Sequence, residues 1–231
     1  MIVLMSAFLL LSAFSCGGGN KANSTSEQSE ETAVNVPQFD ADSAYLYVKN
    51  QVDFGPRVPN TKEHVACGNY LAGQLEAFGA QVTNQYADLI AYDGTLLKAR
   101  NIIGSYKPES KKRIALFAHW DTRPWADNDP DEKNHNTPIL GANDGASGVG
   151  ALLEIARLVN QQQPELGIDI ILLDAEDYGA PQFYTGQHKE EFWCLGSQYW
   201  ARNPHVQGYN ARFGILLDMV GGEGSVFMKE G

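Results

Sequence analysis

Cysteine is scarce in this chain of 231 residues, and Cys16, Cys67 and Cys194 are the three that occur. None of them has the spacing of a cysteine or histidine cluster that holds zinc. With Cys16 set aside, one disulfide is possible, between Cys67 and Cys194. Sequence spacing alone does not decide whether it forms.

Basic residues are also few, with 17 lysines and arginines against 28 aspartates and glutamates and a formal net charge of −11. Nucleic-acid binding requires a basic face, and no lysine or arginine stripe is present. The basic cluster at 111–113 is typical of the solvated entry to a strand. We therefore expect no nucleic-acid partner, and the length suits a single α/β domain with a substantial core.

Long apolar runs are absent too, since the stretch Ile2–Leu11 is too short to span a bilayer. Residues 1–15 carry no charge and have the character of an export signal. Residues 13–16 read Ala-Phe-Ser-Cys, which resembles a bacterial lipobox, where the signal is cleaved before a cysteine that is then lipidated. We thus predict a lipoprotein signal peptide over 1–15 and lipidation of Cys16.

The glycine- and serine-rich segment 16–36 is typical of a flexible tether, which leaves 37–231 as the folded domain. The combined expectation is an exported protein, lipid-anchored to a bacterial membrane and facing the periplasm. A plain secretory signal with an incidental cysteine is the alternative. Metabolic labelling with a fatty acid separates the two, because an unlabelled protein would exclude the anchor.

The chain is organised around Leu140–Gly148, which reads Leu-Gly-Ala-Asn-Asp-Gly-Ala-Ser-Gly. Apolar residues then recur at the three-and-four spacing of a helix that buries one face. These residues are Val149, Leu152, Leu153, Ala156 and Val159. The pattern therefore places the acid Asp144 just before the N-terminus of a helix.

Three apolar runs each end in an acid or a histidine. Residues 113–118 are followed by His119-Trp120-Asp121, residues 168–173 by Asp174-Ala175-Glu176-Asp177, and residues 213–217 by Asp218. Ligands of open α/β sheets bind beyond the carboxyl ends of strands. We therefore expect His119 and these acids to converge on one crevice.

Further elements are predicted from periodicity and capping signals. They are a helix over 40–52 that packs on the sheet, a helix capped by Asn60 or Thr61 that presents Val65, Leu71, Leu75 and Phe78, strands over 81–86 and 99–105, a short helix over 196–202, and a strand from 225 to 228. His64, in the first turns of the second helix, is expected at the surface or half-buried. The acids of the loop 123–132 are expected in a solvated turn.

Five motifs together carry a family resemblance that covers Phe54–Gly222. They read Phe-Gly-Pro-Arg-Val-Pro, Ala-His-Trp-Asp-Thr-Arg-Pro-Trp-Ala-Asp, Gly-Ala-Asn-Asp-Gly-Ala-Ser-Gly, Leu-Asp-Ala-Glu-Asp and Leu-Leu-Asp-Met-Val-Gly. On these motifs the chain resembles the zinc aminopeptidases of peptidase family M28 and, within them, the animal-type glutaminyl cyclases with their bacterial members. The resemblance implies an open, mixed, largely parallel twisted sheet with helices on both faces.

The resemblance also implies roles for individual residues. Asp144 and Asp177 look like zinc ligands and Glu176 like the general acid/base. Asp218 looks like an acid that hydrogen-bonds in the cyclase pocket or binds a second metal in the peptidases, with His119 as the matching ligand. Asp121 would orient His119, and Trp193 would form a wall for the substrate side chain.

Two departures from the family pattern accompany these roles. Asp177 stands where many relatives carry glutamate, so the backbone must approach the ion more closely. A further zinc histidine is expected from a later strand, and no suitable candidate precedes Gly231. We therefore expect the carboxyl-terminal part of the domain to be missing.

The resemblance implies a glutaminyl-peptide cyclotransferase, which converts the amino-terminal glutamine of peptides and proteins to pyroglutamate and releases ammonia. The alternative is a two-zinc aminopeptidase, in which His119 and Asp218 hold the second ion. A binding ectodomain without catalysis is a third interpretation. It is disfavoured because the acids Asp144 and Glu176 are present.

Overall fold

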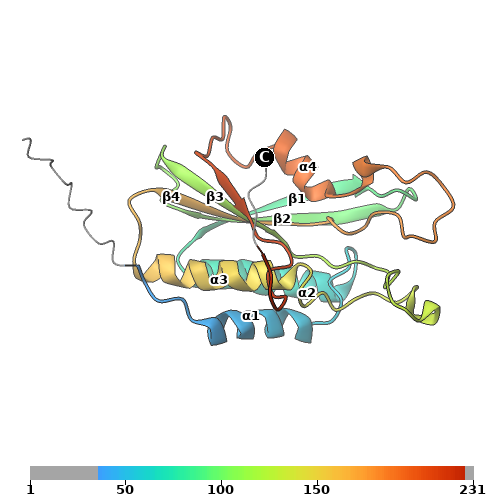
Figure 1. Ribbon diagram of the computed structural model, residues 1–231. Coiled ribbons are helices and arrows are strands. Elements are labelled where there is room, and N and C mark those ends of the chain that lie inside the picture. Colours follow the sequence, from blue (N-terminus) through green and yellow to red (C-terminus); the bar gives the residue numbers. More distant parts are fainter. Residues whose placement is uncertain (1–35, 227–231) are drawn as a thin grey trace, which may run out of the picture. The chain divides into compact units, whose positions relative to one another are not determined.

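The fold is built on a five-stranded sheet with the strand order β1-β2-β4-β3-β5 (Figure 1). The elements in chain order are α1 (Ala41–Asp53), α2 (Lys62–Ala77), β1 (Gln81–Ile90), β2 (Leu96–Tyr106), β3 (Arg113–His119), η1 (Glu132–Asn134), α3 (Ala146–Gln161), β4 (Gly167–Leu173), η2 (Glu190–Phe192), α4 (Leu195–Arg202) and β5 (Gly214–Leu216).

The computed structural model describes residues 36–226. The predicted signal peptide at 1–15, the lipidation site Cys16, nearly all of the tether and part of the strand expected at 225–228 lie outside the described residues. Among the helices that are described, none has the length and apolar character needed to cross a bilayer.

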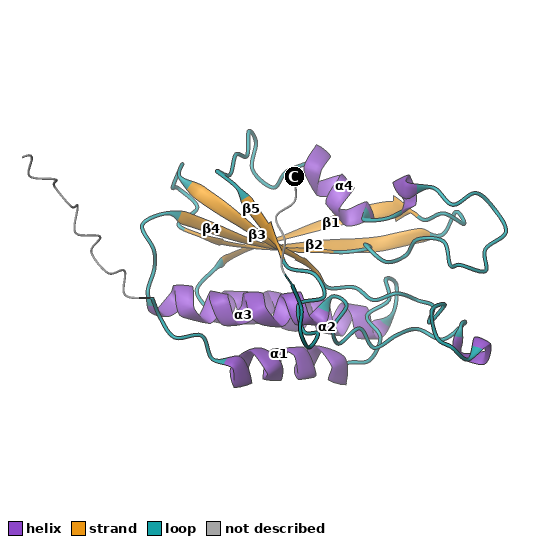
Figure 2. Ribbon diagram, viewed as in Figure 1, coloured by secondary structure: helices purple, strands orange, loops and turns teal. Residues whose placement is uncertain are grey.

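The sheet is open and mixed, as expected. Strand β3 runs parallel to β4 and to β5, whereas β1 pairs antiparallel with β2 and β2 antiparallel with β4. Helices α2 and α3 cover one face and α4 covers the other (Figure 2). Because β3, β4 and β5 are parallel, their carboxyl ends meet at one edge of the sheet.

The core lies between the sheet and the α2–α3 layer. All five residues of the predicted α3 face are buried, and they pack against strand residues such as Ile102, Ile170 and Leu172. Helix α2 begins after Thr61, whose side chain accepts a hydrogen bond from His64 N, and it buries Leu71 and Leu75. Its predicted face is wrong at Val65, which is 56% exposed.

The prediction that the first helix packs on the sheet is wrong, because α2 and α3 already occupy that face. Helix α1 instead lies against the outer side of α3 (Figure 1). The buried Gln51 of α1 donates from Nε2 to Ala146 O at 3.2 Å, and Asp40 N donates to Glu154 Oε1 at 2.9 Å. Tyr45 and Leu46 therefore remain exposed.

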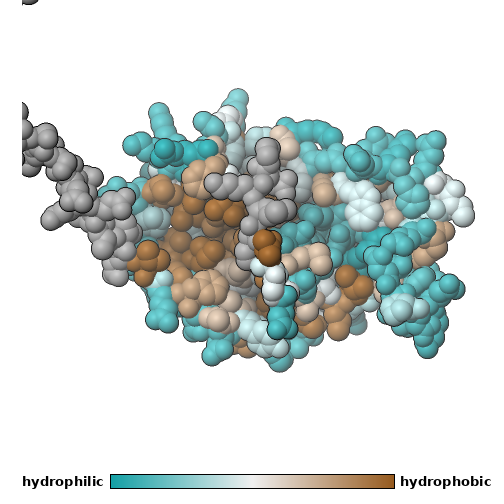
Figure 3. All heavy atoms as spheres, in the orientation of Figure 1, coloured by the Kyte–Doolittle hydropathy of each residue, from teal (hydrophilic) through white to brown (hydrophobic). Residues whose placement is uncertain are grey.

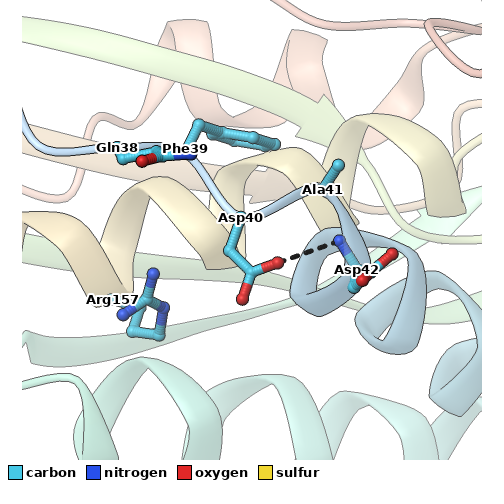
Figure 4. A pocket seen from close by; sticks show the side chains of 6 residues that line it. All are labelled: Gln38, Phe39, Asp40, Ala41, Asp42 and Arg157. Carbon is cyan, nitrogen blue, oxygen red and sulfur yellow. Dashed lines mark hydrogen bonds between the residues drawn. The ribbon is translucent and has the colours of Figure 1, made fainter.

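Asp40 is the N-cap of α1, and its carboxylate accepts hydrogen bonds from Asp42 N at 3.0 Å and Ser43 N at 3.3 Å. It borders a surface pocket of about 490 Å³ in which Arg157 of α3 is the basic residue (Figure 4). Arg157 lies in the last turns of α3, at the opposite end of that helix from Asp144. This pocket is therefore separate from the acids at the strand ends.

Strand β5 is an outermost strand of the sheet, paired on one side only, and all three of its residues are exposed. Phe213, just before β5, and Met219, three residues after it, have 54% and 53% of their surface exposed. Hydrophobic residues gather on the face of the molecule that Figure 3 shows.

Candidate functional site

The predicted site residues converge at the edge where the parallel strands end. His119 is the last residue of β3, Glu176 and Asp177 follow β4, and Asp218 follows β5. Asp144 precedes α3. Ligand atoms of His119, Asp144 and Asp177 all lie within 4.8 Å of one another, and so do those of His119, Glu176 and Asp218.

His119 occupies the centre of the cluster and is 1% exposed. Its Nε2 lies 2.9 Å from Asp144 Oδ1 and 3.6 Å from Asp218 Oδ1. Burial by itself would lower the pKa of His119, but the carboxylates of Asp121, Asp144 and Asp218 outweigh it and raise the pKa well above 6.5. The hydrogen bond from His119 in turn lowers the pKa of Asp144.

Asp121 holds the turn that follows β4. Its Oδ1 accepts a hydrogen bond from Glu176 N and its Oδ2 one from Asp177 N, both at 3.1 Å. We predicted that Asp121 orients His119; its Oδ1 lies 3.5 Å from His119 Nδ1, which makes no hydrogen bond. The contacts of Asp121 therefore fix the two acids of the turn more directly than they fix the imidazole.

The two acids of this turn are half-buried. Burial raises the pKa of Glu176 to about 7, and the carboxylates of Asp121 and Asp218 add to the rise. Burial likewise raises the pKa of Asp177, together with the charges of Asp121 and Asp144. Glu176 can therefore hold or release a proton near neutral pH, which is the property required of a general acid/base.

The donor set suits zinc, which binds imidazole nitrogen and carboxylate oxygen in catalytic sites. Asp177 Oδ2 is buried and has no hydrogen-bond partner, so its lone pairs are available to an ion. Several like charges also gather around the cluster, and a divalent cation would offset their repulsion. The residues present at this edge therefore fit a metal ion.

The loop before α3 is shaped to bring Asp144 next to His119. Gly145 has φ +83°, a left-handed conformation that favours glycine. A Cβ at Gly145 would lie 2.9 Å from Asp121 O and 3.1 Å from His119 Cε1. Both the conformation and the close approach therefore require glycine beside the acid.

The segment that carries Asp218 is held against the start of α3. Asn143 Oδ1 accepts a hydrogen bond from Gly221 N at 2.8 Å, and Ser147 Oγ accepts one from Val220 N at 3.0 Å. These two contacts place Asp218 beside Asp144, although Asp218 is the most exposed acid of the cluster, with 42% of its side chain accessible.

Arg57 is fully buried and supports the loop that carries Asp144. Its guanidinium donates to three main-chain carbonyls, those of Trp120 at 3.1 Å, Leu140 at 2.6 Å and Gly141 at 2.8 Å. The contacts connect the end of β3 to the loop that carries Asp144. Burial lowers the pKa of Arg57, and the acids Asp121 and Asp144 favour its charged form.

A pocket of about 340 Å³ opens beside Asp144 and Asp177. Its lining comprises Arg123, Asp127, Asn128, Asp144, Asp177, Ala180, Gln182, His188 and Trp193. Trp193, the predicted wall, takes part in this lining, with the guanidinium carbon of Arg123 at 4.8 Å from its ring centre. The lining of the pocket therefore includes one large aromatic ring, that of Trp193, and three acids, Asp127, Asp144 and Asp177.

Arg123 and Asp127 join the two loops around this pocket, and their contribution could not be read from spacing. Arg123 Nε donates to Asp127 Oδ1 at 2.7 Å, and Arg123 Nη1 donates to Asp177 O at 3.0 Å. Asp127 is 4% exposed and also accepts from Gln182 N. The expected solvated turn is therefore wrong for Asp127, because the cation beside it stabilises a buried carboxylate.

Gly179 permits the position of the Trp193 ring, because a Cβ there would lie 2.1 Å from Trp193 Cε2. For the peptide substrate that the family resemblance implies, Gly179→Ala should displace the ring and raise KM about tenfold, which corresponds to about 1.4 kcal/mol of binding. Steady-state kinetics would measure this. Gly73→Ala is the control, because nothing lies within 4 Å of that Cβ. An unchanged KM for Gly179→Ala would exclude the Trp193 wall.

Comparison with known proteins agrees with this geometry. The sequence model described as peptidase family M28 matches residues 101–230, which include every acid of the cluster. The chain belongs to peptidase family M28. In this M28 protein, His119, Asp144, Glu176, Asp177 and Asp218 all lie within the matched part.

Solved structures resemble this M28 chain closely. A Bacteroides thetaiotaomicron glutaminyl cyclase bound to N-acetylhistamine is 94% identical, with TM-score 0.84 over 85% of this chain and 68% of its own. A structure described as a leucine aminopeptidase precursor from Bacteroides thetaiotaomicron VPI-5482 has the same identity, coverage and TM-score. The glutaminyl-peptide cyclotransferase of Drosophila melanogaster is 24% identical over 195 residues. The M28 chain covers 79% of its own length in that match and 50% of the fly protein.

His64 is a second position in this region, after Asp127, where the sequence prediction was wrong. It is 3% exposed rather than at the surface, and its Nε2 lies 2.9 Å from Asp174 Oδ2. The pairing partner is more than a hundred residues away in the chain. No local pattern around His64 indicates that contact.

Proposed function

We propose that this M28 protein is a zinc-dependent glutaminyl cyclase, which converts the amino-terminal glutamine of peptides to pyroglutamate and releases ammonia. The observation that carries the proposal is the 94% identity with the Bacteroides thetaiotaomicron glutaminyl cyclase over 85% of this chain. The position of Glu176 is consistent with it, because Glu176 shares a ligand group with His119, and His119 also belongs to the group with the candidate ligands Asp144 and Asp177.

The cluster divides into residues with distinct tasks. Asp144 and Asp177 would hold zinc, with His119 Nε2 in the same ligand group. When bound, zinc supplies a Lewis acid that polarises the side-chain carbonyl of the substrate glutamine. The pocket beside Trp193 would hold that side chain close to the α-amine, and this proximity lowers the barrier of an intramolecular reaction.

Glu176 performs the proton transfer in this scheme. The α-amine nitrogen forms a bond with the side-chain carbonyl carbon, and Glu176 takes the proton that the nitrogen loses. The bond from that carbon to the amide nitrogen then breaks, and Glu176 gives the proton to the departing ammonia. A pKa of about 7 suits both directions of transfer.

An aminopeptidase is the second candidate, favoured by the group His119, Glu176 and Asp218, whose ligand atoms also lie within 4.8 Å of one another. A second ion there would suit a two-metal hydrolysis of the first peptide bond. The cyclase proposal needs no water as nucleophile, so the two reactions give different products.

Incubation of the full chain, loaded with zinc, with a glutamine-initiated peptide distinguishes the candidates. Ammonia and a pyroglutamyl peptide are expected, whereas free glutamine would show the aminopeptidase. The same peptide with an acetylated α-amine is the control, because it offers no amine for cyclisation. Absence of both products at an occupied zinc site would overturn the proposal.

A further inference from the structure

A buried acid, Asp174, lies at the start of the turn that carries Glu176 and Asp177, and it takes no part in the cluster described above. Asp174 follows the last residue of β4, is 0% exposed and precedes Glu176 by two positions. Its Oδ2 accepts a hydrogen bond from Arg100 N at 2.6 Å, and its Oδ1 accepts one from Ala175 N at 2.7 Å. The carboxylate therefore joins strand β2 to the first residue of the turn.

The turn needs this support because its backbone is strained. Ala175 has φ +52°, in the left-handed region that costs a residue with a Cβ about 1–2 kcal/mol. Strain of this kind persists where the surroundings hold it. Asp174 binds the amide of Ala175, and Asp121 binds the two amides that follow.

His64 supplies the partner that Asp174 requires. Its Nε2 lies 3.0 Å from Oδ1 and 2.9 Å from Oδ2, so one ring nitrogen serves both oxygens. The imidazole stacks on Trp120 with ring centres 4.3 Å apart, and Trp120 Nε1 donates to Arg100 O at 3.1 Å. The pair is therefore fixed on both sides by packing and hydrogen bonds.

We propose that His64 and Asp174 form a positioning pair, which holds the strained turn so that Asp177 faces the metal and Glu176 faces the substrate. Neither residue touches the reacting atoms. This inference rests on the proposed function for its kinetic consequence, but its effect on zinc binding is independent of the reaction. Loss of a partner that orients metal ligands typically lowers metal affinity 10–100-fold.

The chain offers a matched control for a test of this pair. Asp169 lies on β4 itself, is equally buried and pairs with Arg113, with Arg113 Nε 2.5 Å from Asp169 Oδ2. It also accepts a hydrogen bond from Ser105 Oγ at 2.6 Å. Asp169→Asn thus removes a buried charge from within β4, and Asp174→Asn removes the same charge from the residue that follows β4, with only Asp174 beside the turn.

The test measures zinc affinity by competition with a chelator, kcat and KM, and thermal unfolding of the full chain. Asp174→Asn should raise the zinc dissociation constant 10–100-fold and lower kcat, with KM within about threefold of wild type. Asp169→Asn should lower thermal stability and leave zinc affinity within threefold. Equal losses of zinc affinity in both variants, or none in Asp174→Asn, would overturn the proposal.

A second pair of variants keeps the test decisive if Asp174→Asn does not fold. His64→Gln retains an N–H donor for Asp174, whereas His64→Leu retains none. Zinc affinity should fall in His64→Leu and recover at least in part in His64→Gln. Equal zinc affinity in these two variants would exclude the positioning role. Intact zinc binding without pyroglutamate formation by the wild type would contradict the proposed function alone.

Discussion

Glu176→Gln should reduce kcat for pyroglutamate formation about 10²–10⁴-fold, because general acid/base catalysis contributes a factor of that size. The amide has nearly the volume of the carboxyl group but cannot take and return a proton. KM should change little, since Glu176 does not form the wall of the pocket. Ammonia release from a glutamine-initiated peptide provides the measurement.

The same substitution should stabilise the metal-free protein above about pH 7. The pKa of Glu176 is about 7 in the folded state against 4.5 for an ordinary glutamate. Below pH 4.5 the acid is neutral in both states and carries no penalty. As the pH rises toward 7 the unfolded chain releases the proton first, so folding stability declines by up to about 3 kcal/mol. Glutamine removes this decline.

Thermal unfolding of the metal-free wild type and Glu176→Gln at pH 4 and pH 8 would test the second effect. The variant should have the higher Tm at pH 8 and a similar Tm at pH 4. Glu165→Gln is the control, because Glu165 is exposed and outside the site. Turnover near that of the wild type would exclude Glu176 as the acid/base, and a Tm difference independent of pH would exclude the ionisation argument.

Arg57→Met should lower the free energy of unfolding by more than about 3 kcal/mol. The guanidinium satisfies three buried carbonyls, and each carbonyl left without a donor costs about 1–3 kcal/mol. Arg57→Lys should recover only part of the loss, because a single ammonium cannot reproduce the planar fork of donors. Denaturant unfolding gives the measurement.

The comparison for Arg57 is Arg202→Met, which removes an exposed guanidinium at the end of α4. That change should alter stability by less than about 0.5 kcal/mol. Loosening of the Asp144 loop should also weaken zinc binding in Arg57→Met but not in Arg202→Met. A stability change below about 1 kcal/mol for Arg57→Met would show that the carbonyls find other partners.

The sequence predicted the elements whose pattern is local. Strands β3, β4 and β5 are apolar runs that lead into a histidine or an acid, and helix α3 has apolar periodicity and is preceded by Asp144. These patterns predicted the positions of the elements and the convergence of His119, Asp144 and Asp177. Helix α1 shows the limit of this approach. Its amphipathic spacing predicts a buried face but does not specify whether the sheet or another helix covers that face.

The supporting residues of the site were harder to predict because their partners are distant in the chain. His64 pairs with a residue 110 positions away, and Arg57 binds carbonyls 63 to 84 positions away. Asp127 lies in an acidic, proline-containing loop that suggests solvent exposure, yet Arg123 brings it into the interior. Such contacts depend on the tertiary fold, which composition and spacing do not encode.

His119 belongs to both candidate ligand groups, and in each case its Nε2 is the atom directed at the acids. An imidazole nitrogen has a single lone pair, so one histidine side chain donates to one cation at a time through that atom. Occupation of the group with Asp144 and Asp177 therefore withdraws the histidine from the group with Glu176 and Asp218. An ion in the first group would therefore leave Glu176 and Asp218 without the imidazole ligand for a second ion, and Glu176 would then keep its carboxylate for proton transfer.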